Sequence, residues 1–131
     1  YLNQVGLDYS HGTGHGVGYF LNVHEGPHAI SKNNKIKFKE GMIVSNEPGY
    51  YEKNKFGIRI ENLIYVKKKK KKTYFKNLTM APIEKELINI KMLNSNEKKW
   101  LNDYHREVYG NLKNSMSKKE VKELKLACSA I

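Results

Sequence analysis

Residues 10–18, Ser-His-Gly-Thr-Gly-His-Gly-Val-Gly, are the stretch around which the chain is organised, and Val-His-Glu-Gly-Pro at 23–27 closes it. Glycine tolerates positive φ and lets a backbone approach a ligand closely, so the stretch predicts an irregular loop or strand end. A helical zinc motif would place His11 and His15 on one face. However, each of the four interleaved glycines would cost a helix about 1 kcal/mol relative to alanine. A dinucleotide fingerprint is also excluded, because Val17 stands where the third glycine is required.

The histidines of this stretch are candidates for metal ligation or proton transfer, with an ordinary surface loop as the alternative. Two carboxylates downstream favour a metal site. Glu47 ends the apolar, β-branched run at 43–46 and precedes a Pro-Gly turn. The alternation of residues 56–66 predicts a strand with Arg59 and Glu61 on one face. Imidazole with carboxylates is the ligand chemistry of hydrolytic metal sites, although Glu61 alone would be interpreted as a solvent-facing residue paired with Arg59.

Three motifs agree in order and spacing with one known family. They are HGTGHGVG…NVHEGP at 11–27, EGMIVSNEPGYY at 40–51 and FGIRIEN at 56–62. Together they closely resemble the Xaa-Pro aminopeptidases, metallopeptidases of the pita-bread fold. The resemblance continues through YFKNLTMAPIEKELI and WLNDYH and covers most of the chain. It implies an α+β fold: residues 1–74 form the C-terminal part of a pita-bread catalytic domain, and residues 75–131 form a C-terminal extension of one strand followed by helices.

The resemblance also implies a two-metal site of two aspartates, one histidine and two glutamates. By motif position, His15, Glu47 and Glu61 are the metal ligands of this chain, and Glu61 bridges the two ions. The family's two aspartate ligands lie upstream of the stretch that Tyr1 matches, and Asp8 stands in a lead-in segment. We therefore expect a C-terminal fragment of a longer peptidase that is inactive alone. Oxygen-rich ligation with a single imidazole favours Mn²⁺ over zinc.

The same resemblance assigns the remaining site residues. Glu47 is expected to be catalytic as well as a ligand, because it accepts a proton from the attacking water. His11 and His24 are similar to the family's substrate-side histidines, which lie near the reacting carbonyl and help to move protons. Arg59 is assigned to the substrate-binding group, where it orients Glu61 or a neighbouring carboxylate.

The implied activity is release of the N-terminal residue from peptides that have proline in the second position. Prolidases and creatinases share the fold, and prolidases share the metal ligands, so both are alternatives within it. A non-catalytic binding module on the same scaffold is a third alternative, but such relatives typically lose ligands that are present here. In larger members of the family the C-terminal extension contributes to dimerisation, so the intact enzyme is expected to be a homodimer.

The chain carries 24 Lys+Arg against 13 Asp+Glu, a formal net charge of +11. Such a balance can indicate a nucleic acid or an anionic membrane as partner. Apart from the block at 67–72 the lysines are dispersed, and arginine, which gives bidentate base contacts, stands only at 59 and 106. Neither partner is expected, and the block is interpreted as an exposed hairpin tip. A lone Cys128 permits no internal disulfide, which favours a reducing compartment and a cytoplasmic location.

Local patterns predict further elements. Residues 15–24, where Leu21 is one of the alternating apolar residues, are expected to form a strand or an extended segment, and residues 35–40 are expected to form a short strand. Residues 57–67 are expected to form one strand.

The C-terminal part is expected to be helical. Ser-Asn-Glu at 95–97 can cap an amphipathic helix, and residues 118–127 are expected to form a second. His105 is expected on a helix surface. Three apolar or aromatic residues are expected in a core or interface: Met92, Trp100 and Tyr104.

Overall fold

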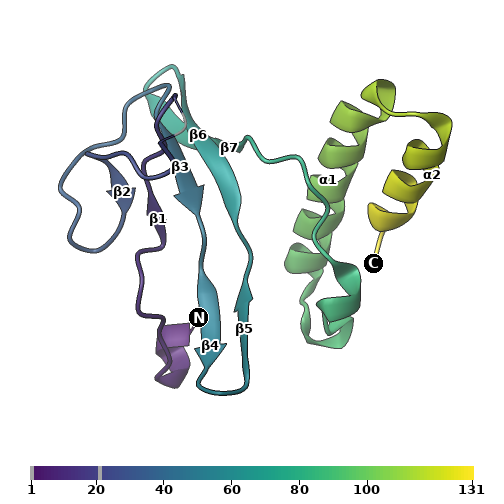
Figure 1. The fold of residues 1–131 in the computed structure, drawn as a ribbon, viewed down its shortest axis with the longest axis horizontal. Helices are drawn as coiled ribbons and strands as arrows, with labels where there is room; N and C mark the ends of the chain where they lie inside the picture. The colour runs from purple at the N-terminus through teal and green to yellow at the C-terminus, as the bar shows by residue number, and fades with distance from the viewer. Residues whose placement is uncertain (1, 21) are drawn as a thin grey trace. The chain divides into compact units, whose positions relative to one another are not determined.

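The computed structural model describes residues 2–20 and 22–131. The chain divides into two compact units, the strand unit (Tyr1–Thr79) and the helical unit (Met80–Ile131). Figure 1 shows antiparallel strands in the first and two α-helices in the second, so the predicted α+β class is confirmed. Among the helices that the structure describes, none combines the length and the apolarity that a membrane crossing requires.

The strand unit consists of small antiparallel sheets preceded by a 3-10 helix (Leu2–Val5). Strand β1 pairs with β2, strand β4 pairs with β5, and the third sheet has the order β3-β6-β7. The strands are β1 (Gly14–His15), β2 (Ala29–Ile30), β3 (Ile43–Asn46), β4 (Gly49–Glu52), β5 (Phe56–Arg59), β6 (Asn62–Lys69) and β7 (Lys72–Asn77).

The predicted strand at 43–46 is confirmed as β3, but the prediction of one strand over 57–67 is wrong. Two residues separate β5 from β6, and two separate β3 from β4. The register is the same on both sides of this gap: Asn46 faces Asn62 before it, and Gly49 faces Arg59 after it. The antiparallel ladder is therefore interrupted without a shift of its strands.

The interruption has a local cause. Pro48 lies in the gap and has no N–H to donate to a ladder. The N–H of the preceding residue, Glu47, donates to the carbonyl of Thr13 at 2.7 Å, outside the hairpin. The ladder bonds are consequently lost at this point while the two strands continue on either side.

Residues 15–24 do not form the predicted continuous strand, because β1 ends at His15. The chain then folds back on itself: the N–H of Gly16 donates to the carbonyl of His28 at 2.9 Å, and its carbonyl accepts from the N–H of Glu25 at 2.9 Å. Leu21, part of the predicted alternation, lies outside the described residues.

Residues 35–40 are not a strand either. The side chain of Asn34 donates to the carbonyl of Ala29 at 2.7 Å and accepts from the N–H of Ile36 at 3.1 Å. An asparagine side chain that bonds nearby backbone groups in this way competes with ladder formation.

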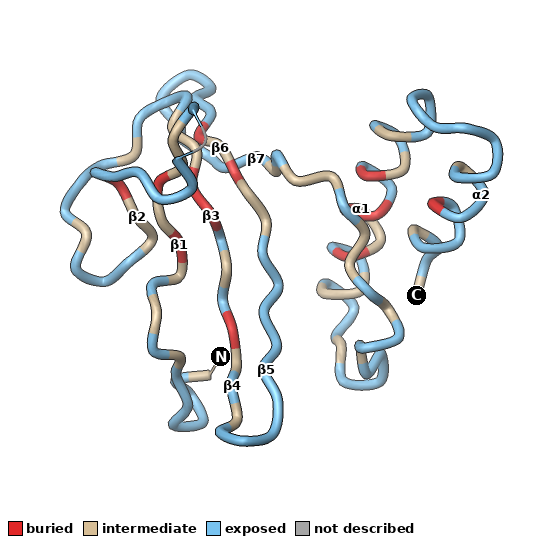
Figure 2. Tube along the Cα trace, viewed as in Figure 1, coloured by how far each residue is buried: buried red, intermediate tan, exposed pale blue. Residues whose placement is uncertain are grey.

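The core of the strand unit is small and lies on one face of the β3–β6 pair. Val44 and Val66 are fully buried and Ile64 nearly so, and Figure 2 shows these positions in red on β3 and β6. Strand β1 lies against β3, since Gly16 forms a bridge with Val44. The glycine-rich stretch is therefore packed beside the strand that leads to Glu47.

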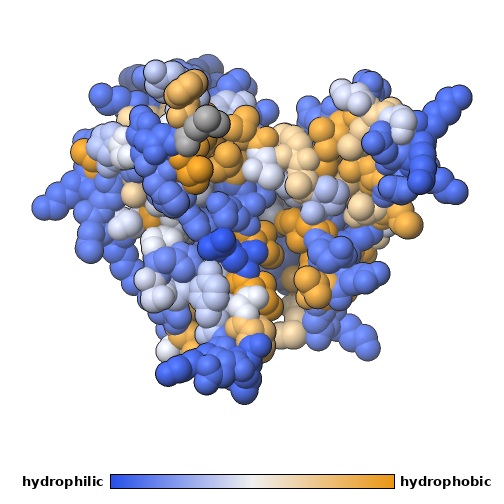
Figure 3. Space-filling view, in the orientation of Figure 1, coloured by the Kyte–Doolittle hydropathy of each residue, from blue (hydrophilic) through white to orange (hydrophobic). Residues whose placement is uncertain are grey.

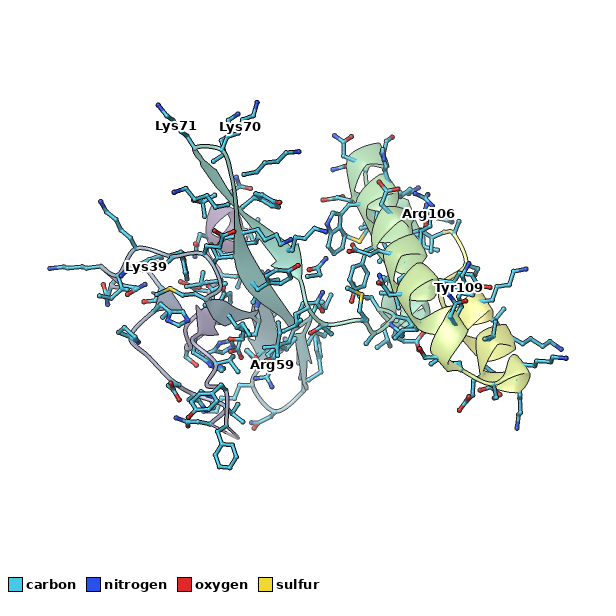
Figure 4. All side chains as sticks on the ribbon, turned by 90° about the horizontal axis from the view of Figure 1, so that it is seen from above. Lys39, Arg59, Lys70, Lys71, Arg106 and Tyr109 are labelled. Carbon is cyan, nitrogen blue, oxygen red and sulfur yellow. The ribbon has the colours of Figure 1, made fainter. Side chains whose placement is uncertain are left out.

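The lysine block forms the tip of the β6–β7 hairpin, as the sequence predicted. Lys70 adopts a positive φ of 56° in the turn, and Lys69 faces Lys72 across it. Lys70 and Lys71 project from the end of the hairpin in Figure 4. The face of the strand unit seen in Figure 3 is largely hydrophilic, which agrees with the net charge of +11.

The helical unit contains two α-helices and short 3-10 turns. Helix α1 (Ser95–Leu112) is capped by Asn94, one residue before the predicted cap, in a capping box with Glu97. Helix α2 (Lys118–Ala127) has the predicted bounds and a capping box of Ser117 and Glu120. The 3-10 turns are Lys85–Leu87, Ile90–Met92 and Lys113–Ser115.

The core of the helical unit is formed by Leu101, Tyr104, Val108 and Leu124. Tyr104 thus lies in a core as predicted. Trp100 and Met92 lie outside it, at 56% and 81% exposure, and a place for them in an interface stays a prediction.

The prediction that His105 lies on the surface is wrong, because its side chain is fully buried. Its Nε2 accepts the N–H of Ile83 at 3.1 Å, which leaves the hydrogen of the neutral ring on Nδ1. Burial, followed by the nearby Lys85 charge, lowers the pKa of His105 below its ordinary value. It lies four positions after Leu101, so it falls on the same buried stripe of α1.

Acid should therefore destabilise the helical unit. The unfolded chain binds a proton at His105 near the usual pKa of about 6.5, while the folded chain resists protonation. The stability that neutral His105 contributes should therefore be fully present above pH 6.5, and the free energy of unfolding should fall as the pH drops below that value. Urea unfolding of the chain, followed by helical circular dichroism at pH 7.5 and 5.5, measures this change. His105→Gln should remove the pH-dependent part, and an equal fall in that variant would contradict the assignment.

Candidate metal centre

The interruption of the ladder places two carboxylates together. When the register of β3–β6 and β4–β5 is extended across the gap, Glu47 lies opposite Glu61. Side chains alternate between the faces of a strand, so Glu47 and Glu61 share a face with Ser45 and Arg59. In this register the two carboxylates face each other and neither faces a lysine. Both point to a common region.

His15 approaches the same region from β1. Its Nε2 lies 3.2 Å from Oε1 of Glu47, and ligand atoms of His15, Glu47 and Glu61 all lie within 4.8 Å of one another. Within residues 2–20 and 22–131, these side chains form the group of histidine, cysteine or acidic residues whose geometry could hold a metal ion. The three predicted ligands are therefore brought together by the fold.

The orientation of the His15 ring also suits a ligand. Its Nδ1 lies 2.9 Å from the carbonyl oxygen of Gly16, and a carbonyl can only accept, so Nδ1 carries the hydrogen. In the neutral ring the lone pair is then on Nε2, the nitrogen that faces Glu47. Metal-binding histidines usually donate their other N–H to a carbonyl or carboxylate in this way.

Ser45 is a site residue that the sequence analysis missed. It is fully buried, accepts the backbone N–H of His15 at 2.9 Å and donates to Oε1 of Glu47 at 2.8 Å. One hydroxyl therefore fixes both the strand that carries the imidazole and the carboxylate beside it. The available signal was a small polar residue inside an apolar run, two positions before Glu47 and hence on the same strand face.

Arg59 lies between the two carboxylates. Its guanidinium is 3.7 Å from Oε2 of Glu47 and 3.4 Å from Oε2 of Glu61. The side chain is half-exposed, and Figure 4 shows it at the edge of the strand unit. A cation placed there offsets the repulsion between two neighbouring carboxylates and limits how each can turn.

The two other predicted histidines lie around this group without joining it. The His24 ring packs against the ring of His15, with centroids 4.1 Å apart and planes 37° apart. His11 lies against Tyr9, with ring centroids 4.7 Å apart, and its Nε2 is 2.8 Å from the hydroxyl of Tyr51. The structure therefore places one imidazole among the carboxylates and two beside it.

The glycines permit this close arrangement. A Cβ on Gly14 would overlap the carbonyl oxygen of Ser45, and a Cβ on Gly16 would overlap the carbonyl oxygen of Glu25. Alanine at either position would push β1 away from β3 or from the returning segment. The stretch is not helical, as the glycine content predicted.

One imidazole and two carboxylates form a donor set that suits divalent transition metals such as Mn²⁺. The site could also transfer protons, because the Glu47 carboxylate, held by the Ser45 hydroxyl, can accept a proton beside a bound ion. Such a donor set is one that hydrolytic metal sites use.

Comparison with known proteins agrees with this geometry. The model of metallopeptidase family M24 matches residues 1–68, and that of the C-terminal region of peptidase M24 matches residues 72–131. A probable Xaa-Pro aminopeptidase P of Laccaria bicolor is 55% identical over 119 residues, covering 82% of this chain and 18% of that protein. Aminopeptidase P2 of Arabidopsis thaliana is 51% identical over 118 residues, covering 82% of this chain and 17% of that protein.

A solved structure gives the same result. The crystal structure of X-prolyl aminopeptidase from Caenorhabditis elegans, described as a cytosolic enzyme with a di-nuclear active site, matches with a TM-score of 0.85 at 38% identity. The match covers 99% of this chain and 23% of that one. This chain thus spans about a fifth of the length of these relatives. With the family model matching more than half of its residues, the chain belongs to metallopeptidase family M24.

Proposed function

We propose that this chain is the C-terminal part of a longer Xaa-Pro aminopeptidase, a two-metal enzyme that releases the N-terminal residue from peptides with proline in the second position. The observation that carries the proposal is the convergence of His15, Glu47 and Glu61 within 4.8 Å. The names of the relatives, which are Xaa-Pro or X-prolyl aminopeptidases, support the substrate class. Residues 1–74 would belong to the catalytic domain and residues 75–131 to its C-terminal extension.

The donor set fits the proposed metals. His15, Glu47 and Glu61 would hold one side of a site for two divalent ions, and two aspartates would come from chain outside these 131 residues. Oxygen-rich ligation favours Mn²⁺. When bound, such ions polarise the peptide carbonyl and lower the pKa of the attacking water.

The residues of this chain supply the remaining chemistry. Glu47 accepts a proton from the water. The Ser45 hydroxyl, which donates to Oε1 of Glu47 at 2.8 Å, keeps the carboxylate oriented as a metal ligand. His11 and His24 lie on the substrate side, where they support the developing charge on the carbonyl oxygen or carry a proton to the departing proline nitrogen. Arg59 orients both carboxylates and borders the substrate.

The alternatives make different predictions. A prolidase would cleave dipeptides that end in proline, a creatinase-like relative would act on a different substrate class, and a binding module would not hydrolyse peptides. We also propose a cytoplasmic homodimer that does not depend on nucleic acid or a membrane. The lone Cys128 and the cytosolic description of the Caenorhabditis elegans relative support the compartment.

The 131-residue chain should be inactive as a peptidase. It holds one imidazole and two carboxylates of the proposed site, while the proposed aspartates lie outside it. The purified chain, free of host peptidases, should release no N-terminal residue from an Xaa-Pro peptide in Mn²⁺. A rate comparable to that of a full-length enzyme containing this chain would show that the site is complete within these residues.

Substitutions of Glu47 and of His24 in such a full-length enzyme should differ in their effects on metal content and activity. Glu47→Gln keeps the shape but removes the charge and basicity, so metal content should fall and kcat should collapse even in excess Mn²⁺. His24→Ala should keep its metal and lose roughly 10²–10⁴-fold in activity, the usual contribution of acid–base or oxyanion support.

Elemental analysis and steady-state kinetics on one Xaa-Pro peptide measure both effects. Glu52→Gln is the matched control, because Glu52 pairs with Lys55 on the same hairpin and lies outside the ligand group. Loss of metal in His24→Ala, with metal and activity retained in Glu47→Gln, would reverse the assigned roles.

The lysine block should be dispensable for hydrolysis. Strand β6 rises roughly 3.3 Å per residue, so the hairpin tip lies roughly 26 Å along the strand from Glu61. This exceeds the Debye length of about 8 Å at physiological salt. Replacing residues 67–72 with a short polar turn in the full-length enzyme should leave kcat/KM for a neutral peptide nearly unchanged. A fall beyond about tenfold would mean that the block contacts substrate or supports the fold.

A further inference from the structure

Both ring nitrogens of His11 have a partner. Nδ1 lies 2.8 Å from the carbonyl oxygen of Gly12, and Nε2 lies 2.8 Å from the hydroxyl of Tyr51, forty residues further along the chain. The Tyr51 ring also meets the His11 ring edge-on, with centroids 5.5 Å apart. His11 is therefore held in one orientation by a strand that is distant in sequence.

The two contacts determine where the hydrogen lies. A carbonyl oxygen can only accept, so Nδ1 of His11 carries the hydrogen. In the neutral ring Nε2 is then an acceptor, and the Tyr51 hydroxyl must be the donor.

Two histidines of the glycine-rich stretch, His11 and His15, make the same backbone contact but differ in the partner of the second ring nitrogen. His15 makes the same contact through Nδ1, to the carbonyl of the glycine that follows it, but its Nε2 faces Glu47. His11 and His15 thus share a tautomer, and what distinguishes them is the group at Nε2: a carboxylate for His15 and the Tyr51 hydroxyl for His11.

The position of Tyr51 is built into the β4–β5 hairpin. Tyr51 faces Gly57 across the pair, and Gly49 lies two residues earlier on the same face. A Cβ on Gly49 would come within 2.6 Å of the Tyr51 hydroxyl oxygen, and one on Gly57 within 2.7 Å of the ring. The two glycines therefore leave the space in which the ring lies against the backbone.

We propose that Tyr51 is a positioning residue that, together with the Gly12 carbonyl, holds neutral His11 in the Nδ1–H tautomer, with Nε2 as a proton acceptor. The catalytic consequence rests on the proposed function. On the substrate side of the site, His11 takes up a proton at Nε2 before it can donate one there, and the Tyr51 hydroxyl keeps that nitrogen aligned until it does.

The tautomer can be measured without substrate or metal. Two-dimensional ¹H–¹⁵N correlation of the imidazoles in the 131-residue chain, at about pH 8.5 and thus well above the usual histidine pKa of about 6.5, should show His11 protonated at Nδ1. Tyr51→Phe keeps the ring but removes the donor to Nε2, so the share of His11 protonated at Nδ1 should fall, although the Gly12 carbonyl still accepts from Nδ1. Gly49→Ala keeps the hydroxyl but displaces the ring, and it should give the same result. Tyr50→Phe is the control, because the Tyr50 ring packs near Phe56, at 6.0 Å.

A wild-type chain with His11 protonated at Nε2 would overturn the proposal, as would an unchanged His11 spectrum in Tyr51→Phe. A change in Gly49→Ala alone would then indicate a role of Tyr51 confined to packing.

The kinetic consequence is tested in a full-length enzyme containing this chain. Tyr51→Phe should lower kcat by about 10- to 100-fold, the usual cost of losing a partner that orients a site residue. Metal content should stay at the wild-type level, and Tyr50→Phe should behave like wild type. Unchanged kcat would overturn the catalytic consequence. The expected tautomer in an enzyme without peptidase activity would support the Tyr51 assignment while refuting the proposed function.

Discussion

The two-residue interruption in the ladder between β3–β4 and β5–β6 is the constraint on which the strand unit depends. Because the register is kept across it, Glu47 and Glu61 stay opposite each other and on one face. Because the ladder bonds are absent there, the N–H of Glu47 bonds to Thr13 and draws the glycine-rich stretch against β3. One local loss of pairing thus assembles a group of ligands from three separate segments.

The glycine-rich stretch is irregular, as predicted, but the structure gives a different reason for its glycines. Their pattern predicted close approach of the backbone to a ligand, whereas the close contacts in the structure are with other parts of the chain. The groups that a side chain at Gly14 or Gly16 would meet are, however, backbone carbonyls of Ser45 and Glu25. Near Tyr51 the space left by Gly49 and Gly57 is filled by an aromatic ring of the same hairpin. Glycine here allows the chain to pack on itself so closely that the functional side chains meet.

Elements that depend on local patterns could be predicted from the sequence, including β3, the lysine hairpin tip and the bounds of α2. The interruption at 60–61 could not, since apolar residues alternate through it and only the opposite strand, with Pro48, breaks the pairing. Ser45 and Tyr51 were missed for a related reason: their partners, His15 and His11, lie thirty and forty residues away. His105 was misplaced because its polarity was weighed above its position on the buried stripe of α1.

The convergence of ligands from three segments has a consequence for stability. Few apolar side chains are buried in the described part of the strand unit. His15 lies on β1, which pairs with β2, whereas Glu47 and Glu61 lie on the two sides of the interrupted ladder. An ion held by all three would join β1 to both sides of the interrupted hairpin. It would bind the folded chain and not the unfolded one, so at a hundred times its dissociation constant it would add about 2.7 kcal/mol to the free energy of unfolding. Metal supply would then influence how long the folded polypeptide survives.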